Sequence, residues 1–134
     1  MGLYKRILLT LDCSPVDDAI VPHICGLAKI HGSQVFLIHV VHSHTLDQDR
    51  VLHEQTSAFM AEKEKIFKAQ GIPVKVIIRS GEPDQELMEE LDNNDYDLIA
   101  MATHGHSFFM DLLFGSISDR LKHKTNIPLL LIKA

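Results

Sequence analysis

Small and hydroxyl-bearing residues gather in one stretch near the C-terminal end of the chain. The stretch runs Ala102-Thr103-His104-Gly105, then nine residues, then Gly115-Ser116-Ile117-Ser118. Glycine lets a backbone approach a ligand closely, and a helix N-terminus offers free N–H groups and a positive dipole end. Because a helix is predicted to begin at Ser116, these are the parts of a phosphate cradle. A glycine loop with a serine helix cap, and no ligand, is the alternative.

A carboxylate follows the first apolar run of the sequence, in Thr10-Leu11-Asp12-Cys13-Ser14. A carboxylate at the end of a strand can accept hydrogen bonds from ribose hydroxyls or from an adenine amino group. The alternative is that Asp12 caps the following helix or starts a turn. Asp12 by itself leaves both interpretations open.

Histidine is frequent, with nine residues in a chain of 134. The pairs His42/His44 and His104/His106 have a spacing that could seat a metal ion on extended backbone. No cysteine or acidic residue completes either pair as a motif, so we expect surface or hydrogen-bonded histidines and no metal site. His39 lies within an apolar strand and is expected to be a hydrogen-bonded core residue.

The elements that must position these residues alternate regularly between strand and helix. Short apolar runs typical of strands buried on both faces are separated by amphipathic helical patterns, with a polar loop over residues 42–49. This order predicts a parallel, doubly wound sheet, in which ligands bind beyond the carboxyl ends of the strands. The strands are expected at 7–11, 34–41, 74–78, 96–101 and 127–132, and the helices at 17–31, 51–70, 84–91 and 116–124.

The composition is that of one globular domain spanning residues 1–134. A net charge of −5 offers no electrostatic footprint for nucleic acid or an anionic membrane. No apolar run approaches the ~18 residues needed to span a bilayer, and no signal peptide is evident, so we expect a cytoplasmic protein. Cys13 and Cys25 are too few for a disulfide framework and are expected to be reduced thiols.

The chain resembles the universal stress protein family over essentially its whole length. Each motif is weak evidence on its own, but the motifs together occur in the order found in the family. The resemblance rests on Thr10-x-Asp12-x-Ser14, Gly81-Glu82-Pro83, Tyr96-Asp97-Leu98-Ile99 leading into Met101-Ala102-Thr103-His104-Gly105, Leu112-Leu113-Phe114-Gly115-Ser116, and Asn126-Ile127-Pro128-Leu129-Leu130-Leu131-Ile132.

The resemblance implies a three-layer α/β sandwich with a five-stranded, doubly wound parallel sheet, of the adenine nucleotide alpha hydrolase-like kind. It also implies a dimer with a role in stress. One branch of the family binds ATP through Gly-x-x-Gly-x9-Gly-Ser/Thr, and this chain keeps that spacing with Ala102 in place of the first glycine. The added methyl group could crowd a ribose or phosphate. The loop also carries Phe108 and Phe109, with no Lys or Arg between Gly105 and Gly115.

By position in the family, the resemblance implies a binding site for an adenine nucleotide, with ATP favoured. Triphosphate charge would be met by backbone N–H groups, histidines, hydroxyls or a divalent cation such as Mg²⁺. The base and ribose would lie by Thr10, Asp12, Val40 and Val41, the ribose and α-phosphate by Met101, Ala102 and Gly105, and the outer phosphates by Gly115, Ser116, Ile117 and Ser118.

Three functions are compatible with these observations. The first is a nucleotide-binding stress protein that senses or sequesters an adenine nucleotide, with at most slow hydrolysis. The second is a stress protein without nucleotide that acts through contacts with unknown protein partners, which Ala102 and the Phe108-Phe109-Met110 loop favour. The third is an enzyme, but no Walker-type loop and no nucleophile elbow is present. We therefore expect a binding protein rather than an enzyme.

A homodimer is expected to form through the last strand, at residues 127–132. The run is apolar at nearly every position, and an uncovered apolar edge strand invites pairing with another strand. Pro128 and Lys133 protect it only near its two ends. A two-fold axis through this contact would close the assembly as a dimer.

Overall fold

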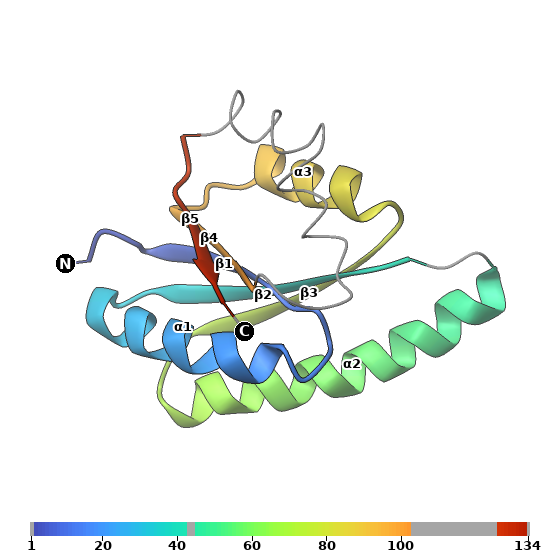
Figure 1. The fold of residues 1–134 in the computed structure, drawn as a ribbon, viewed down its shortest axis with the longest axis horizontal. Coiled ribbons are helices and arrows are strands. Elements are labelled where there is room, and N and C mark those ends of the chain that lie inside the picture. The colour runs from blue at the N-terminus through green and yellow to red at the C-terminus, as the bar shows by residue number, and fades with distance from the viewer. Residues whose placement is uncertain (1, 43–44, 103–125, 134) are drawn as a thin grey trace.

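The computed structural model describes residues 2–42, 45–102 and 126–133, which form a parallel sheet with helices on both faces (Figure 1). The predicted helix at 116–124 lies outside the described residues, as does most of the candidate phosphate cradle. In chain order the elements are β1 (Arg6–Thr10), α1 (Asp17–His31), β2 (Gln34–Val41), α2 (Leu46–Ala69), β3 (Val74–Ser80), α3 (Pro83–Asn93), β4 (Leu98–Ala102) and β5 (Leu129–Ile132).

The five strands are ordered β3-β2-β1-β4-β5, and every neighbouring pair is parallel. The chain winds outward from β1 to β3 and then returns to place β4 on the other side of β1. The strand order therefore reverses between β1 and β4, which is the topological switch point of a doubly wound sheet. This confirms the fold class predicted from the alternation of strands and helices.

Each face of the sheet has its own aliphatic core. Ile7 and Leu9 of β1 pack with Ile20 of α1 and Met60 of α2, a group we call the α1-side cluster. The intervening Leu8 packs with residues of α3, in the α3-side cluster. Figure 1 shows α1 and α2 together on one face and α3 on the other. All three β1 residues are fully buried, which explains why the strand is a continuous apolar run.

The first helix has the predicted bounds, and Gly32 ends it in the left-handed conformation with φ of 64°. The second helix begins at Leu46, so the prediction of a loop over 42–49 is wrong for its last four residues. Thr45 caps α2 by accepting a hydrogen bond from the backbone N–H of Gln48 at 3.0 Å. The first turn is exposed, with Leu46 90% accessible, so it lacks the apolar periodicity from which the helix was predicted.

The remaining boundaries shift by small amounts. The third helix begins at Pro83, one residue before the predicted start, and no side chain caps its N-terminus. Proline suits the first helical position because the N–H that it lacks would have no partner there. The fourth and fifth strands begin two residues later than predicted, at Leu98 and Leu129. None of the helices in the described part of the chain has the length and apolar character needed to cross a bilayer.

Candidate functional site

The carboxyl ends of β1, β2 and β4 come together at one edge of the sheet, at the switch point. Thr10 ends β1, and its hydroxyl donates a hydrogen bond to the backbone carbonyl of Ala100 in β4 at 3.2 Å. Val41 ends β2 and Ala102 ends β4. The structure thus brings together, at the edge where ligands of such sheets bind, residues that lie about 90 positions apart in the sequence.

The loop after β1 is anchored by a buried carboxylate that the sequence analysis did not identify. Asp17, the first residue of α1, accepts hydrogen bonds from the backbone N–H groups of Asp12 at 2.9 Å and Cys13 at 2.8 Å. Its side chain is 1% exposed. Burial raises the pKa of Asp17, and the bonds from the loop backbone act against that rise by favouring the carboxylate. The only sequence signal was an acidic residue at the start of a helix.

Asp12 itself is a half-buried side chain that does not cap the helix. One of its carboxylate oxygens accepts a hydrogen bond from the Ser14 hydroxyl at 2.6 Å. No side chain caps α1, because the residue at its N-cap position is Val16. The capping alternative for Asp12 is therefore wrong. Since Asp17 holds the loop through the backbone, the Asp12 carboxylate is not needed to keep the loop in place.

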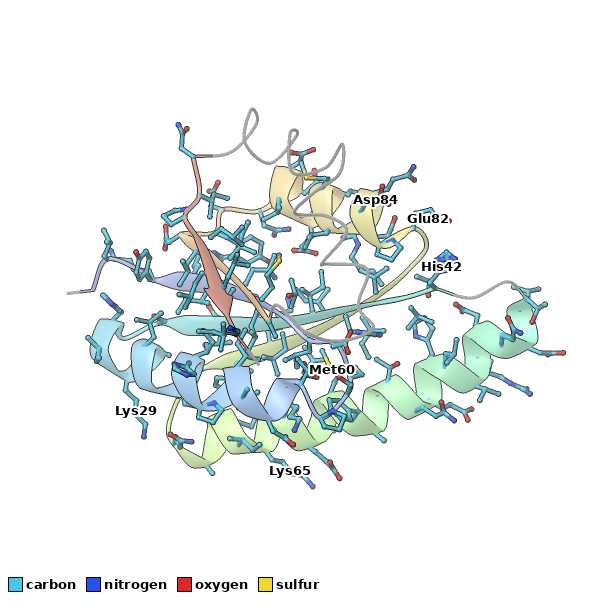
Figure 2. All side chains as sticks on the ribbon, viewed as in Figure 1. Lys29, His42, Met60, Lys65, Glu82 and Asp84 are labelled. Atoms are coloured by element: carbon cyan, nitrogen blue, oxygen red, sulfur yellow. The ribbon has the colours of Figure 1, made fainter. Side chains whose placement is uncertain are left out.

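Cys13 occupies the tightest position of this loop. Its φ of 59° is the only positive value among the described residues that are not glycine. Its Sγ lies 4.0 Å from the Sδ of Met60, which α2 presents from beneath the loop (Figure 2). Burial and, to a lesser extent, the nearby carboxylates of Asp17 and Asp12 raise the pKa of the thiol to about 12, against the opposing charge of Lys63. Both cysteines are free, as predicted.

The raised pKa predicts an unreactive thiol at Cys13. A pKa about three units above the ordinary value of 9.0 lowers the thiolate fraction at pH 8 about 1,000-fold, and only the thiolate attacks an alkylating agent. We expect iodoacetamide to modify Cys13 in the folded protein at a correspondingly slow rate, measured by peptide mass spectrometry. The denatured chain is the control and should react like a free thiol. Modification of folded Cys13 within about tenfold of the denatured rate would contradict this account.

The end of β2 is tied to the same loop. The His39 ring nitrogen Nδ1 lies 2.7 Å from the backbone carbonyl of Leu11, which confirms that His39 is hydrogen-bonded, although it is half-buried and not a core residue. Because a carbonyl only accepts, Nδ1 carries the proton in this contact. The flanking Val40 and Val41 are 4% and 3% exposed and point to opposite faces of the sheet. A ligand at this edge would therefore meet mainly the backbone of Val40 and Val41.

The side chains at the end of β4 are also buried or half-buried. Met101 is 1% exposed and belongs to the α3-side cluster. Ala102 is half-buried, and its methyl group packs against the α1-side cluster. Its register partner is Ile132 of β5. The Ala102 methyl group therefore contacts the core, whereas the hypothesis from the sequence is that it crowds a ligand.

A histidine and a carboxylate face each other beyond β2. His42 Nδ1 lies 3.9 Å from Glu82 Oε2, at the turn that leads into α3 (Figure 2). In the portion of the chain that the structure describes, no three His, Cys, Asp or Glu side chains are grouped to hold a metal ion. The remaining predicted site residues lie outside the described residues: Gly105, Gly115, Ser116, Ile117 and Ser118. His44, His104, His106 and the Phe108-Phe109-Met110 loop lie outside them as well.

Comparison with known proteins identifies relatives across the full fold. The Universal stress protein family matches residues 3–133. Universal stress protein MJ0577 of Methanocaldococcus jannaschii is 23% identical over 155 aligned positions, which cover 98% of this chain and 96% of that protein. The solved structure of MJ0577 superimposes with a TM-score of 0.78 at 26% identity, covering 98% of this chain and 97% of that one.

Two further solved structures of universal stress proteins share this fold and contain nucleotides. One is in complex with cAMP and matches with a TM-score of 0.72 at 17% identity, covering 98% of both chains. The other, from Archaeoglobus fulgidus, is in complex with dAMP and matches with a TM-score of 0.69 at 19% identity, covering 98% of this chain and 99% of that one. At these identities the likeness shows the fold.

Proposed function

This chain belongs to the universal stress protein family, and from that premise we propose that it binds an adenine nucleotide at the carboxyl ends of β1, β2 and β4. The observation that carries the proposal is the loop at the switch point. There, buried Asp17 holds the backbone of Asp12 and Cys13 and leaves the Asp12 carboxylate half-exposed. A carboxylate at this position accepts from ribose hydroxyls. The cAMP and dAMP complexes of the two structural relatives support a nucleotide of the AMP type.

The proposed roles follow the order of the elements around the crevice. Thr10 and Asp12 would lie by the base and ribose, with the backbone of Val40 and Val41 beside the base. Met101 and Ala102 would follow the ribose, since they end the strand next to β1. The residues proposed for the phosphates are Gly105, Gly115, Ser116, Ile117 and Ser118.

The proposal extends to the role of the bound nucleotide. The protein would sense or sequester the nucleotide in the cytoplasm and hydrolyse it slowly or not at all. ATP is the favoured ligand, and Mg²⁺ would offset triphosphate charge that no Lys or Arg between Gly105 and Gly115 can meet. An enzyme would need a general base with a partner that orients it, and no such pair is identified at Asp12, whose contact is with the Ser14 hydroxyl.

The deciding experiment is mass spectrometry of the ligand released from protein purified without added nucleotide. Isothermal titration with ATP, ADP and AMP, each with and without Mg²⁺, then ranks the nucleotides. Release of an adenine nucleotide together with saturable heat supports the proposal. An empty protein that gives no heat with any of the three at about millimolar concentration excludes it, since binding weaker than that has little physiological use.

The second candidate is a stress protein that acts through protein contacts without nucleotide. Ala102, in place of the first glycine of the nucleotide motif, favours this candidate. The contact of the Ala102 methyl group with the α1-side cluster argues against ligand crowding as the reason.

The substitution Ala102→Gly tests the crowding hypothesis. We expect ATP affinity to change by less than about threefold. We also expect the unfolding midpoint to fall by roughly 2–4 °C, because glycine in a strand costs about 0.5–1 kcal/mol relative to alanine. Titration and thermal unfolding measure the two effects. A tenfold gain in ATP affinity would show instead that the methyl group does crowd the nucleotide.

We further propose a homodimer through β5, and the two edges of the sheet differ in a way that supports it. The β3 edge carries Lys75 and Arg79 within the strand, and charged side chains discourage strand pairing. The β5 edge has no charge within Leu129–Ile132, and Leu129 and Leu131 are 40% and 42% exposed. The β5 edge is therefore the one suited to a second copy of the chain.

A further inference from the structure

A hollow lies near the amino ends of the strands, at the opposite end of the sheet from the proposed nucleotide site. It has a volume of about 590 Å³, within the range of small-molecule sites. Because the strands are parallel, the residues that begin them lie together, and Arg6, Gln34 and Lys75 at the starts of β1, β2 and β3 form one side. Phe36 and Tyr96 line it, as does Glu90 near the C-terminal end of α3.

Arg6 is held in this hollow by aromatic rings. Its guanidinium carbon lies 4.5 Å from the centre of the Phe36 ring and 5.5 Å from that of Tyr96. The two rings meet edge to face at 5.3 Å, and Arg6 Nε donates to the backbone carbonyl of Asp95 at 2.5 Å. Stacking on rings fixes the plane of a guanidinium and leaves its in-plane donors available. Within the described residues, no carboxylate forms an ion pair with Arg6.

The carboxylate that lines the hollow is already fully bonded. Glu90 is 6% exposed, and one of its oxygens accepts from Arg79 Nη1 at 3.1 Å. The other accepts from the Tyr96 hydroxyl and the Asn94 amide, each at 2.7 Å. Burial, together with the bond to Glu90, raises the pKa of Tyr96, so its hydroxyl keeps its proton. The Glu90 carboxylate is therefore hydrogen-bonded to these three donors and forms no ion pair with Arg6.

Two cations that line the hollow favour an anion. Arg6 and the exposed Lys75 line it without a carboxylate partner in the described structure, while Glu90 pairs with Arg79, which Glu86 and Glu89 also contact. Asp97, just before β4, lies beside the start of β1, and its carboxylate accepts hydrogen bonds from the backbone N–H groups of Lys5 and Arg6 at 2.9 Å each. Arg6 therefore has nitrogen donors to offer in the hollow, in the fork geometry that suits a carboxylate or a phosphate.

We propose that this hollow is a second ligand site, which binds a small organic anion. The carboxylate or phosphate of the ligand would pair with the Arg6 guanidinium and Lys75. Because Phe36 and Tyr96 are each only 5% exposed, the planar or apolar part of the ligand would lie beside the stacked Arg6 and against the half-buried Ile77. The site is separate from the nucleotide crevice, which lies at the carboxyl ends of the strands. The proposal for this site does not depend on whether the protein binds a nucleotide.

The probes for this site are benzoate and phenyl phosphate, which carry the same ring with the two candidate anions. Benzyl alcohol, which has the ring but no charge, is the matched neutral probe. The chain has two tyrosines, so ring signals in ¹H–¹³C NMR spectra of the whole protein are assigned with Tyr4→Phe. We expect one or both anions to shift the Tyr96 signals saturably and to leave those of Tyr4 unchanged. The anion that binds more tightly identifies whether the natural ligand is a carboxylate or a phosphate.

Two variants test the cations that the proposal depends on. Arg6→Lys keeps the positive charge but removes the paired N–H donors of the guanidinium, and should weaken anion binding about tenfold. Lys75→Gln alters only an exposed residue and should weaken it about threefold. Lys65→Gln is the control, because Lys65 points outward from α2 on the other face of the sheet (Figure 2).

Three results would overturn the proposal. The first is the absence of a saturable Tyr96 shift with either anion at about 10 mM. The second is binding of benzyl alcohol as tight as that of the anions, which would make the hollow an apolar pocket. The third is unchanged anion affinity in Lys75→Gln, and this variant decides the matter if Arg6→Lys fails to fold.

Discussion

Replacing Asp12 with alanine is expected to weaken adenine nucleotide binding about 10- to 100-fold, because a hydrogen bond to a charged group contributes about 1.5–3 kcal/mol. Isothermal titration of the variant against ATP, ADP and AMP measures the loss. The fold should survive the change. The loop after β1 is anchored by the Asp17 carboxylate through the backbone N–H groups of Asp12 and Cys13, which the substitution leaves in place.

Two control variants separate a ligand contact from a general loss of charge. Asp92→Ala removes an exposed carboxylate near the C-terminal end of α3, away from the crevice, and should leave affinity unchanged. Ser14→Ala removes the hydroxyl that donates to Asp12 at 2.6 Å and should cause a smaller loss than Asp12→Ala. If Asp12→Ala binds nucleotide as tightly as the wild-type chain, Asp12 is not a binding residue and the site has to be placed elsewhere.

The substitution Leu131→Glu is expected to convert the proposed dimer into a monomer. Leu131 is 42% exposed in the single chain, so a glutamate there is tolerated in the monomer. In a two-fold contact between β5 strands, two such carboxylates would be buried close together without partners, which raises the dissociation constant at least about 100-fold. Sedimentation equilibrium over a range of micromolar concentrations measures the change.

The choice of position 131 follows from the side-chain alternation in β5. Leu130 and Ile132 pack against the α1-side cluster of their own chain, so Leu130→Glu would damage the fold as well as the dimer. Ile30→Glu, at a residue of α1 that is 78% exposed, is the matched control and should remain dimeric. A wild-type chain that sediments as a monomer at every concentration would show that the β5 edge does not pair.

Local patterns in the sequence were enough to predict the arrangement of the chain. The apolar run of β2 and the periodicity of α1, ended by Gly32, predicted the bounds of both elements as the structure has them. These patterns report burial, and a parallel strand buried on both faces differs clearly from an amphipathic helix in its spacing of apolar residues. The alternation of the two then leaves few topologies, because crossovers between parallel strands are right-handed.

Local patterns failed where burial does not govern the structure. The first turn of α2 is exposed and depends on a cap at Thr45, so its start was missed. The same limit applies to β5, since the sequence showed an apolar strand but not which of its leucines faces the core of its own chain.

The sequence by itself determined the fold class and placed Asp12 at the end of the first strand, where the switch point of such a sheet lies. The tertiary structure decided how that carboxylate is presented, through the buried side chain of Asp17. It also decided the hollow near the amino ends of the strands, where Arg6, Phe36 and Tyr96 come from three distant segments. Periodicity reveals that a residue is buried or exposed, whereas its partners are set by how strands far apart in the sequence pair and pack.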